Sequence, residues 1–382
     1  MKKKLRTGYT RGACAASAAA AAIRACLEGV PPQRVEIPFP DGSRHVFTVH
    51  RAELLQDGAR ASVIKDAGDD PDVTHGAEII AEVRLLSDKK GILIMGGQGV
   101  GRVTKPGLIV PVGEHAINPV PKRMIEEAVR EVVSDEGPSV EIIISVADGE
   151  KIAKRTINER LGIIGGLSIL GTTGIVKPLS SEAWTATITA TMNVARAVGL
   201  QEVVLCAGRA SEEAHMRRFQ LPEEAYVMMG DYLEFSLVEA RRHGFKLIHL
   251  SAQWAKMLKC ALSEEHLGKV KDPSGYTTHV RHGPLDISKA MVLLSELGLP
   301  EGVLQRDFNT AREVFELIRQ LPQAAQVFKA LCVKTSKVLE KLTGGIPVNA
   351  CLVGYDKKII STTYDTLYDR KSEVRNRKSD YF

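Results

Sequence analysis

The sequence predicts two domains, an α+β domain followed by an α/β domain. The chain has 382 residues, which is longer than one average domain. Its first half mixes a hairpin pattern, separate apolar strands and amphipathic helices, whereas strands and helices alternate regularly after residue 200. Such alternation is typical of βαβ units with a parallel sheet. We place the boundary near residue 199, which gives domains of residues 1–199 and 200–382.

The first half opens with a Gly/Thr loop and an Ala-rich helix. Gly29 and Pro31 are typical helix-ending residues, so we expect this helix over 13–28. Apolar runs on both sides of PDGS predict a β-hairpin over 35–49. The remaining expected elements are strands over 77–86, 92–95 and 141–147 and helices over 121–134 and 181–198, the last with Trp184, Ile188 and Met192 on its apolar side.

The second half shows the regular alternation. We expect strands over 202–206, 225–229 and 246–250, helices near 211–218, 232–243 and 252–262, then helices over 286–297, 308–320 and 323–343 and strands over 347–353 and 358–362. The charged tail 369–382 is predicted to be frayed.

Composition narrows the functional class. The formal net charge is +5, a mild excess that suits an acidic small molecule equally well, whereas a dedicated nucleic-acid binder usually concentrates more basic residues on one face. None of the six cysteines forms a C-x-x-C pair, so we expect a reducing cytoplasm and neither zinc nor disulfides. No run approaches 18 apolar residues and the basic N-terminus lacks an apolar core behind it, so we expect no membrane span and no signal peptide.

The strongest functional signal in the second half is a pattern that predicts a site for a nucleotide-like cofactor. Ligands of such sheets bind outside the carboxyl ends of the strands, where Gly208 would let a ligand approach the backbone. Asp231 ends the next strand about twenty residues later and could accept both ribose hydroxyls. This pattern suits S-adenosylmethionine or a nicotinamide cofactor, although the absence of G-x-G-x-x-G counts against a dinucleotide. Alternatively, Asp231 caps the helix over 232–243.

Three loops of the first half could bind an anionic substrate. The loop before the first helix combines Arg6, Thr7, Thr10 and Arg11 with a helix N-terminus, although Thr10 could simply cap that helix. GGQGVG at 96–101 could form a nest of N–H groups beside Arg102, Thr104 and Lys105, or be a mobile turn. The GTTG loop could offer backbone donors or be a turn bonded to itself, and it consists of Gly171, Thr172, Thr173 and Gly174.

Several segments are familiar in combination and in order. They are LRTGYTRGACAASAAAAA, GRVTKPGLIVPVGEHAINPVPKRMI, RTINERLGIIGGLSILGTTGIVKPLS, MGDYLEFSLVEARRHG and VNACLVGYDKKII. Together they cover nearly the whole chain, most densely 5–180. In these segments the chain resembles the CbiD-type cobalt-precorrin-5B (C1)-methyltransferases.

The resemblance implies methyl transfer from S-adenosylmethionine to C1 of cobalt-precorrin-5B, giving cobalt-precorrin-6A and S-adenosylhomocysteine. It implies a first domain similar to a permuted ribosomal-S5-like domain that binds the corrinoid. The second domain would bind the methyl donor, with Lys256 beside Gly208 and Asp231. Cobalt arrives inside the substrate, so no metal site is expected on the protein. We expect Asp148 or Glu182 as a base, a homodimer, and contacts with neighbouring pathway enzymes.

The chain departs from the family pattern over 251–261. Ala252 and Ala255 stand where we expect glycine, and a Cβ there could crowd the cofactor. The loop that follows, with His279 and His282, is also unusual. Two alternatives therefore remain, a diverged relative with another substrate and a non-catalytic tetrapyrrole-binding protein of the same pathway.

Overall fold

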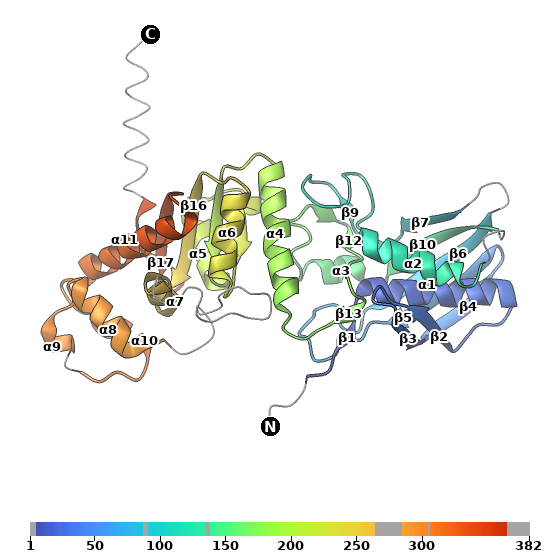
Figure 1. Ribbon diagram of the computed structural model, residues 1–382, viewed down its shortest axis with the longest axis horizontal. Coiled ribbons are helices and arrows are strands. Elements are labelled where there is room, and N and C mark those ends of the chain that lie inside the picture. The colour runs from blue at the N-terminus through green and yellow to red at the C-terminus, as the bar shows by residue number, and fades with distance from the viewer. Residues whose placement is uncertain (1–4, 87–90, 134–137, 264–284, 305, 365–382) are drawn as a thin grey trace, which may run out of the picture. The chain divides into compact units, whose positions relative to one another are not determined.

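The chain folds into two compact units, Met1–Ser180 and Ser181–Phe382. The computed structural model describes residues 5–86, 91–133, 138–263, 285–304 and 306–364 (Figure 1). The division lies earlier in the chain than residue 199, where we expected it. Helix α4 (Ser181–Ala197) therefore belongs to the second unit rather than the first, because its buried side chains Ile188 and Met192 join the second unit's core.

The first unit is built on a five-stranded sheet of order β4-β5-β6-β10-β7. All its neighbours are antiparallel except β10 and β7, which are parallel. Helix α1 packs on β5 and β6, and helix α2 packs on α1. The bounds are β4 Arg51–Leu55, β5 Gly58–Ile64, β6 Glu78–Leu86, β7 Ile92–Gly96, β10 Ser139–Val146, α1 Arg11–Glu28 and α2 Pro119–Arg130.

Helix α1 is the centre of this unit. Its alanines are almost completely buried, so the helix can approach the sheet closely. Thr10 is its N-cap and accepts a hydrogen bond from the N–H of Ala13. Gly29 ends the helix with a left-handed φ of 73°, as the sequence predicts.

Short pairs of strands complete the first unit. The predicted hairpin is present as β2 and β3, and three other pairs join distant segments of the chain. The bounds are β2 Arg34–Pro38 with β3 Arg44–Thr48, β1 Gly8–Tyr9 with β13 Ile175–Val176, β8 Gly99–Val100 with β12 Gly166–Leu167, and β9 Arg102–Val103 with β11 Ile163–Ile164; the short helix α3 is Gly149–Ala153.

The second unit is an α/β fold whose sheet has the order β15-β14-β16-β17-β18. The first four strands are parallel and β18 is antiparallel to β17. The bounds are β14 Glu202–Cys206, β15 Tyr226–Met228, β16 Leu247–Gln253, β17 Val348–Val353, β18 Ile359–Thr362, α5 Arg209–Phe219, α6 Leu233–Arg242, α7 Trp254–Ala261, α8 Ile287–Glu296, α9 Glu301–Leu304, α10 Ala311–Ile318 and α11 Ala324–Thr343. The α+β and α/β classes are both confirmed.

The two faces of this second sheet differ in polarity. One face presents apolar side chains such as Val203, Leu250 and Leu352 to the main hydrophobic core. The other face is covered by α5 and carries buried polar groups, including His249 and Asn349. The strand order changes direction at β14, because β15 pairs on one side of it and β16 on the other.

Candidate functional site

The carboxyl end of the second sheet brings together all three predicted cofactor residues. Gly208 follows β14, Asp231 follows β15, and Lys256 lies in the first turn of α7 after β16. The strand order reverses between β14 and β16, and open parallel sheets bind ligands at such a point. Among the described residues, this is where the sequence-predicted side chains converge on one edge.

Lys256 ties the three segments of this edge together. Its Nζ lies 2.8 Å from Oδ1 of Asp231 and 3.4 Å from the carbonyl oxygens of Ala207 and Gly230. The side chain of Asp231 is 11% exposed and that of Lys256 is 32% exposed. A second ammonium, that of Lys259, lies near Lys256. Burial is the larger cause that lowers the pKa of Lys259, and the charge of Lys256 lowers it further.

Gly208 offers room for a ligand. A methyl group on its Cα would meet no atom within 4 Å, and the residue is in extended backbone at the start of α5. The N-terminus of a helix carries N–H groups and positive dipole that favour an anion. The position therefore fits a carboxylate-bearing ligand that approaches from the sheet edge.

The alternatives at Asp231 and Ala252 can now be compared with the structure. Tyr232, not Asp231, is the N-cap residue of α6. Ala252 is completely buried in the core, so its methyl group does not face the sheet edge and does not crowd a cofactor there. Ala255 is half-buried in the first turn of α7.

In the first unit, two loops lie together at the start of α1. The N–H of Thr10 donates to the carbonyl of Gly174, and the N–H of Gly12 donates to that of Leu170. Gly171 has a φ of 133°, and a Cβ there would come within 2.4 Å of the Thr10 side chain. The structure thus joins two of the predicted anion-binding loops, which lie far apart in the sequence.

Arg11 is the member of this group with unused hydrogen-bonding capacity. Its Nη1 is buried and has no hydrogen-bond partner within the described part of the chain. Burial lowers the pKa of Arg11, and the charge of Asp72 opposes this effect. A buried guanidinium N–H without a partner calls for a water or a ligand acceptor.

Two other residues of these loops already form hydrogen bonds within the first unit. Arg6 forms an ion pair with Asp66, and that hydrogen bond is the main reason the pKa of Asp66 falls to about 2. Thr173 donates to the carbonyl of Ile175 and accepts from its N–H, as in a turn bonded to itself. Thr7 and Thr172 are exposed.

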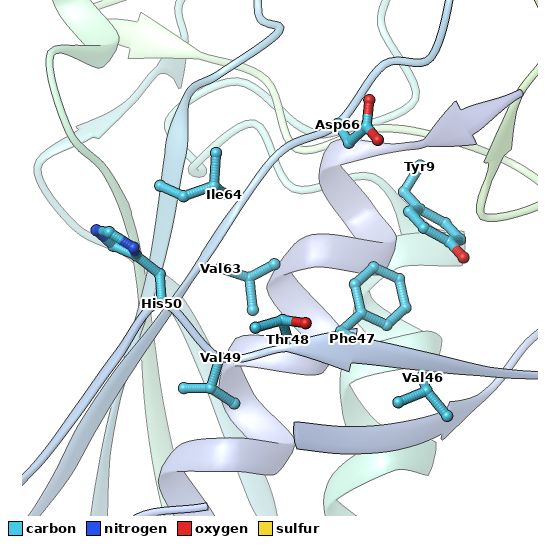
Figure 2. Close-up of a pocket in the computed structure, with 9 residues that line it drawn as sticks. All are labelled: Tyr9, Val46, Phe47, Thr48, Val49, His50, Val63, Ile64 and Asp66. Carbon is cyan, nitrogen blue, oxygen red and sulfur yellow. The ribbon is translucent and has the colours of Figure 1, made fainter. Parts of the chain in front are cut away.

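A hollow of about 390 Å³ lies beside the same loops. Figure 2 shows the ring of Tyr9 next to Phe47, whose centroid is 4.4 Å away, with Asp66 close to them. Val46 and Ile64 add exposed apolar surface. The lining residues are Tyr9, Val46, Phe47, Thr48, Val49, His50, Val63, Ile64 and Asp66.

Arg102, Thr104 and Lys105 make a second group of contacts. Arg102 donates to the carbonyl of Gly113, Thr104 Oγ1 donates to that of Gly162 at 2.9 Å, and Lys105 Nζ lies 3.2 Å from that of Arg160. These bonds fasten the loops around β9 and β11 to one another.

The GGQGVG segment is neither a mobile turn nor an open nest. Its N–H groups at Gly97, Val100 and Gly101 donate to backbone carbonyls of the same unit. Gly99 has a φ of 75°, and a Cβ there would lie 2.1 Å from the carbonyl oxygen of Val146. Close backbone packing, rather than anion binding, explains these glycines.

The two proposed bases are surface residues in different units. Asp148 precedes α3 with a left-handed φ of 52°, has a side chain 71% exposed, and pairs with Lys151 at 3.2 Å. Glu182 is exposed in the first turn of α4. His279, His282 and the tail 369–382 lie outside the described residues.

The sequence analysis did not identify Tyr9 and Phe47, which line the hollow, or the exposed position of Trp184. Trp184 was expected on the apolar side of its helix but is 41% exposed. Helical periodicity alone could not separate it from Ile188, one turn further, which is buried. Within the described residues no group of His, Cys, Asp or Glu is placed to hold a metal ion, and no helix is long and apolar enough to cross a membrane.

Comparisons with known proteins agree along the chain. Residues 1–178 match the family model CbiD, and residues 277–364 match the model of the CbiD C-terminal domain. A solved structure of a cobalamin biosynthesis protein (cbiD) from Archaeoglobus fulgidus is 30% identical and covers 67% of this chain and 79% of its own, with a TM-score of 0.37.

Full-length relatives are more similar. A protein of Desulfotalea psychrophila is 47% identical over 352 residues, which are 90% of this chain and 93% of that protein. A protein of Geobacter metallireducens is 43% identical over 94% of this chain and 98% of its own. Both are named cobalt-precorrin-5B C(1)-methyltransferase. The chain therefore belongs to the CbiD family.

Proposed function

We propose that the chain transfers a methyl group from S-adenosylmethionine to C1 of cobalt-precorrin-5B, giving cobalt-precorrin-6A and S-adenosylhomocysteine. One observation carries the proposal beyond the names of the relatives. It is the meeting of Gly208, Asp231 and Lys256 at the carboxyl end of the parallel sheet, where a nucleoside is expected to bind.

The chemistry of this edge suits the methyl donor. The carboxylate of Asp231 can accept hydrogen bonds from the ribose hydroxyls, beside the partly exposed ammonium of Lys256. The open side of Gly208 and the N-terminus of α5 suit the methionine carboxylate. When bound, S-adenosylmethionine supplies an electrophilic methyl group on its sulfonium.

The acceptor fits the first unit. A corrinoid precursor carries several carboxylates, and the unpartnered Nη1 of Arg11 is the donor best placed to bind one. Thr10, Gly171 and Gly174 frame the same loops. The hollow beside Tyr9 and Phe47 offers apolar surface for an edge of the macrocycle. The contacts of Arg102, Thr104 and Lys105 support a positioning role for their loops.

Methyl transfer from a sulfonium needs alignment more than covalent help. The protein must hold sulfur, methyl and acceptor carbon in line and exclude water. The acceptor system loses a proton, and Glu182 is the better base candidate, because it lies in the same unit as the donor residues.

Location and partners follow from the same proposal. All six cysteines are free, which supports a reducing cytoplasm. A homodimer and contacts with neighbouring cobalamin-pathway enzymes remain predictions.

Anaerobic incubation of the full chain with cobalt-precorrin-5B and donor labelled in its methyl group tests the proposal. The expected result is label on C1 and one S-adenosylhomocysteine for each product molecule. Label on another tetrapyrrole or another carbon would favour a diverged relative. Pigment binding without any methyl transfer would instead leave a non-catalytic tetrapyrrole-binding protein.

A further inference from the structure

Trp184 holds an unusual position for a large aromatic residue. Its side chain is 41% exposed, whereas Trp254, the second tryptophan of the chain, is completely buried. The indole lies directly on Gly230: a Cβ on that glycine would come within 2.9 Å of Cζ2 of Trp184. Gly230 also has a left-handed φ of 58°, so both its conformation and the indole above it require a residue without a side chain.

Tyr232 also packs against the indole. Trp184 stacks with Tyr232 at a centroid distance of 6.4 Å and an interplanar angle of 28°. The hydroxyl of Tyr232 donates to Oγ of Ser181 at 2.9 Å, at the beginning of α4. Tyr232 itself is only 7% exposed. An exposed indole that is fixed in this way is a preorganised surface for a flat ligand.

The proposed ribose site lies next to Trp184. Asp231 follows Gly230 directly, so the carboxylate proposed for the ribose and the glycine under the indole are adjacent. Helix α4 packs against β15, the edge strand beyond β14. A nucleoside whose ribose is held by Asp231 can therefore reach the indole of Trp184 with its base.

We propose that Trp184 is the stacking platform for the adenine ring of the methyl donor. The inference rests on the proposed donor site and assigns recognition of the adenine ring to one residue. Base–aromatic stacking contributes about 1–3 kcal/mol per base, which corresponds to roughly fivefold to 150-fold in affinity. Asp231 and Trp184 together would select a nucleoside, one through its ribose hydroxyls and the other through its ring.

Intrinsic fluorescence gives a direct readout. Because Trp254 is buried, quenching of tryptophan emission by S-adenosylhomocysteine would come from Trp184. The expected result is saturable quenching in the wild type and its loss in Trp184→Phe, while calorimetry shows that the phenylalanine variant still binds. Unchanged emission at saturation in the wild type would overturn the platform.

A ligand without adenine separates stacking from folding. Trp184→Ala should lose roughly fivefold to 150-fold in affinity for S-adenosylhomocysteine but bind S-ribosylhomocysteine as the wild type does. Thr187→Ala, an exposed position on the same helix, is the matched control and should change neither. Equal losses for both ligands in Trp184→Ala would overturn the inference.

The outcomes also separate this inference from the donor site. Binding that is lost in Asp231→Asn but unchanged in Trp184→Ala would overturn the platform and leave the donor site standing. A wild type that does not bind S-adenosylhomocysteine at all would overturn both.

Discussion

The ammonium of Lys256, in the first turn of α7, lies 2.8 Å from the carboxylate of Asp231, which lies between β15 and α6. Lys256→Met should weaken S-adenosylhomocysteine binding and lower the free energy of unfolding by about 1 kcal/mol, because a partly exposed pair is screened by water. Calorimetric titration and denaturant unfolding measure both. Lys246→Met, at an exposed lysine of the same unit, is the control that should change neither; equal effects in the two variants would contradict a specific role.

His215 should make stability depend on pH. Its ring is completely buried, and burial, followed by the nearby His249, lowers its pKa from 6.5 to about 3. The unfolded chain therefore binds a proton that the folded chain refuses, so stability is lost as the pH falls below 6.5. We expect a loss of about 1 kcal/mol for each pH unit.

The window between pH 6.5 and about pH 5 isolates this histidine from the carboxylates, since Asp66 and Asp72 titrate at much lower pH, with folded pKa values of about 2. His215→Phe keeps the ring contacts with Phe219 and Tyr226 and should show a shallower pH dependence in denaturant unfolding. An unchanged slope in the variant would show that other groups cause the loss.

Arg11→Met should raise the KM for the corrinoid with little effect on binding of the methyl donor. The reason is that Nη1 of Arg11 is a buried donor without a partner among the described residues, and a charge-assisted hydrogen bond to a substrate carboxylate is worth about 1.5–3 kcal/mol. Steady-state kinetics measures this. Arg34→Met, at an exposed arginine of the same unit, should leave the KM unchanged; a fall in kcat alone for Arg11→Met would argue against substrate binding.

Gly99→Ala should destabilise the first unit more than Gly76→Ala. Both glycines have positive φ, 75° and 78°, so both variants carry the conformational cost of about 1–2 kcal/mol. Only at Gly99 would the new Cβ meet backbone, at 2.1 Å, whereas Gly76 has nothing within 4 Å. Overpacking should add about 1–3 kcal/mol for Gly99→Ala in denaturant unfolding. Equal losses of stability in the two variants would mean that the backbone around Gly99 shifts to make room for the new Cβ.

Most of the second unit could be predicted from the sequence because each strand there is a short apolar run bounded by turns. Strand β14 begins and ends at the predicted residues. Asp231 and Gly208 could be placed at one edge because parallel strands share their carboxyl ends. The position of Trp184 could not, because helical periodicity gives the face of a residue but not what covers it.

The first unit was harder because its sheet contains strands of weak propensity. Strand β5 was not predicted, since it contains Ala59 and Ala61, which are poor strand formers. These small residues are completely or almost completely buried and leave room for the alanines of α1, so the requirement for close packing hides the strand. The Asp57-Gly58 pair before it was a usable turn signal.

Titration of the full chain with S-adenosylhomocysteine, in the wild type, Asp231→Asn and the exposed control Asp307→Asn, tests the central claim most directly. The account predicts saturable binding in the wild type and in Asp307→Asn, and a loss of at least roughly tenfold in Asp231→Asn, because a buried carboxylate that accepts ribose hydroxyls is replaced by an amide. Wild-type affinity in Asp231→Asn, or no binding by any of the three, would contradict the placement of the methyl donor at this edge of the second sheet.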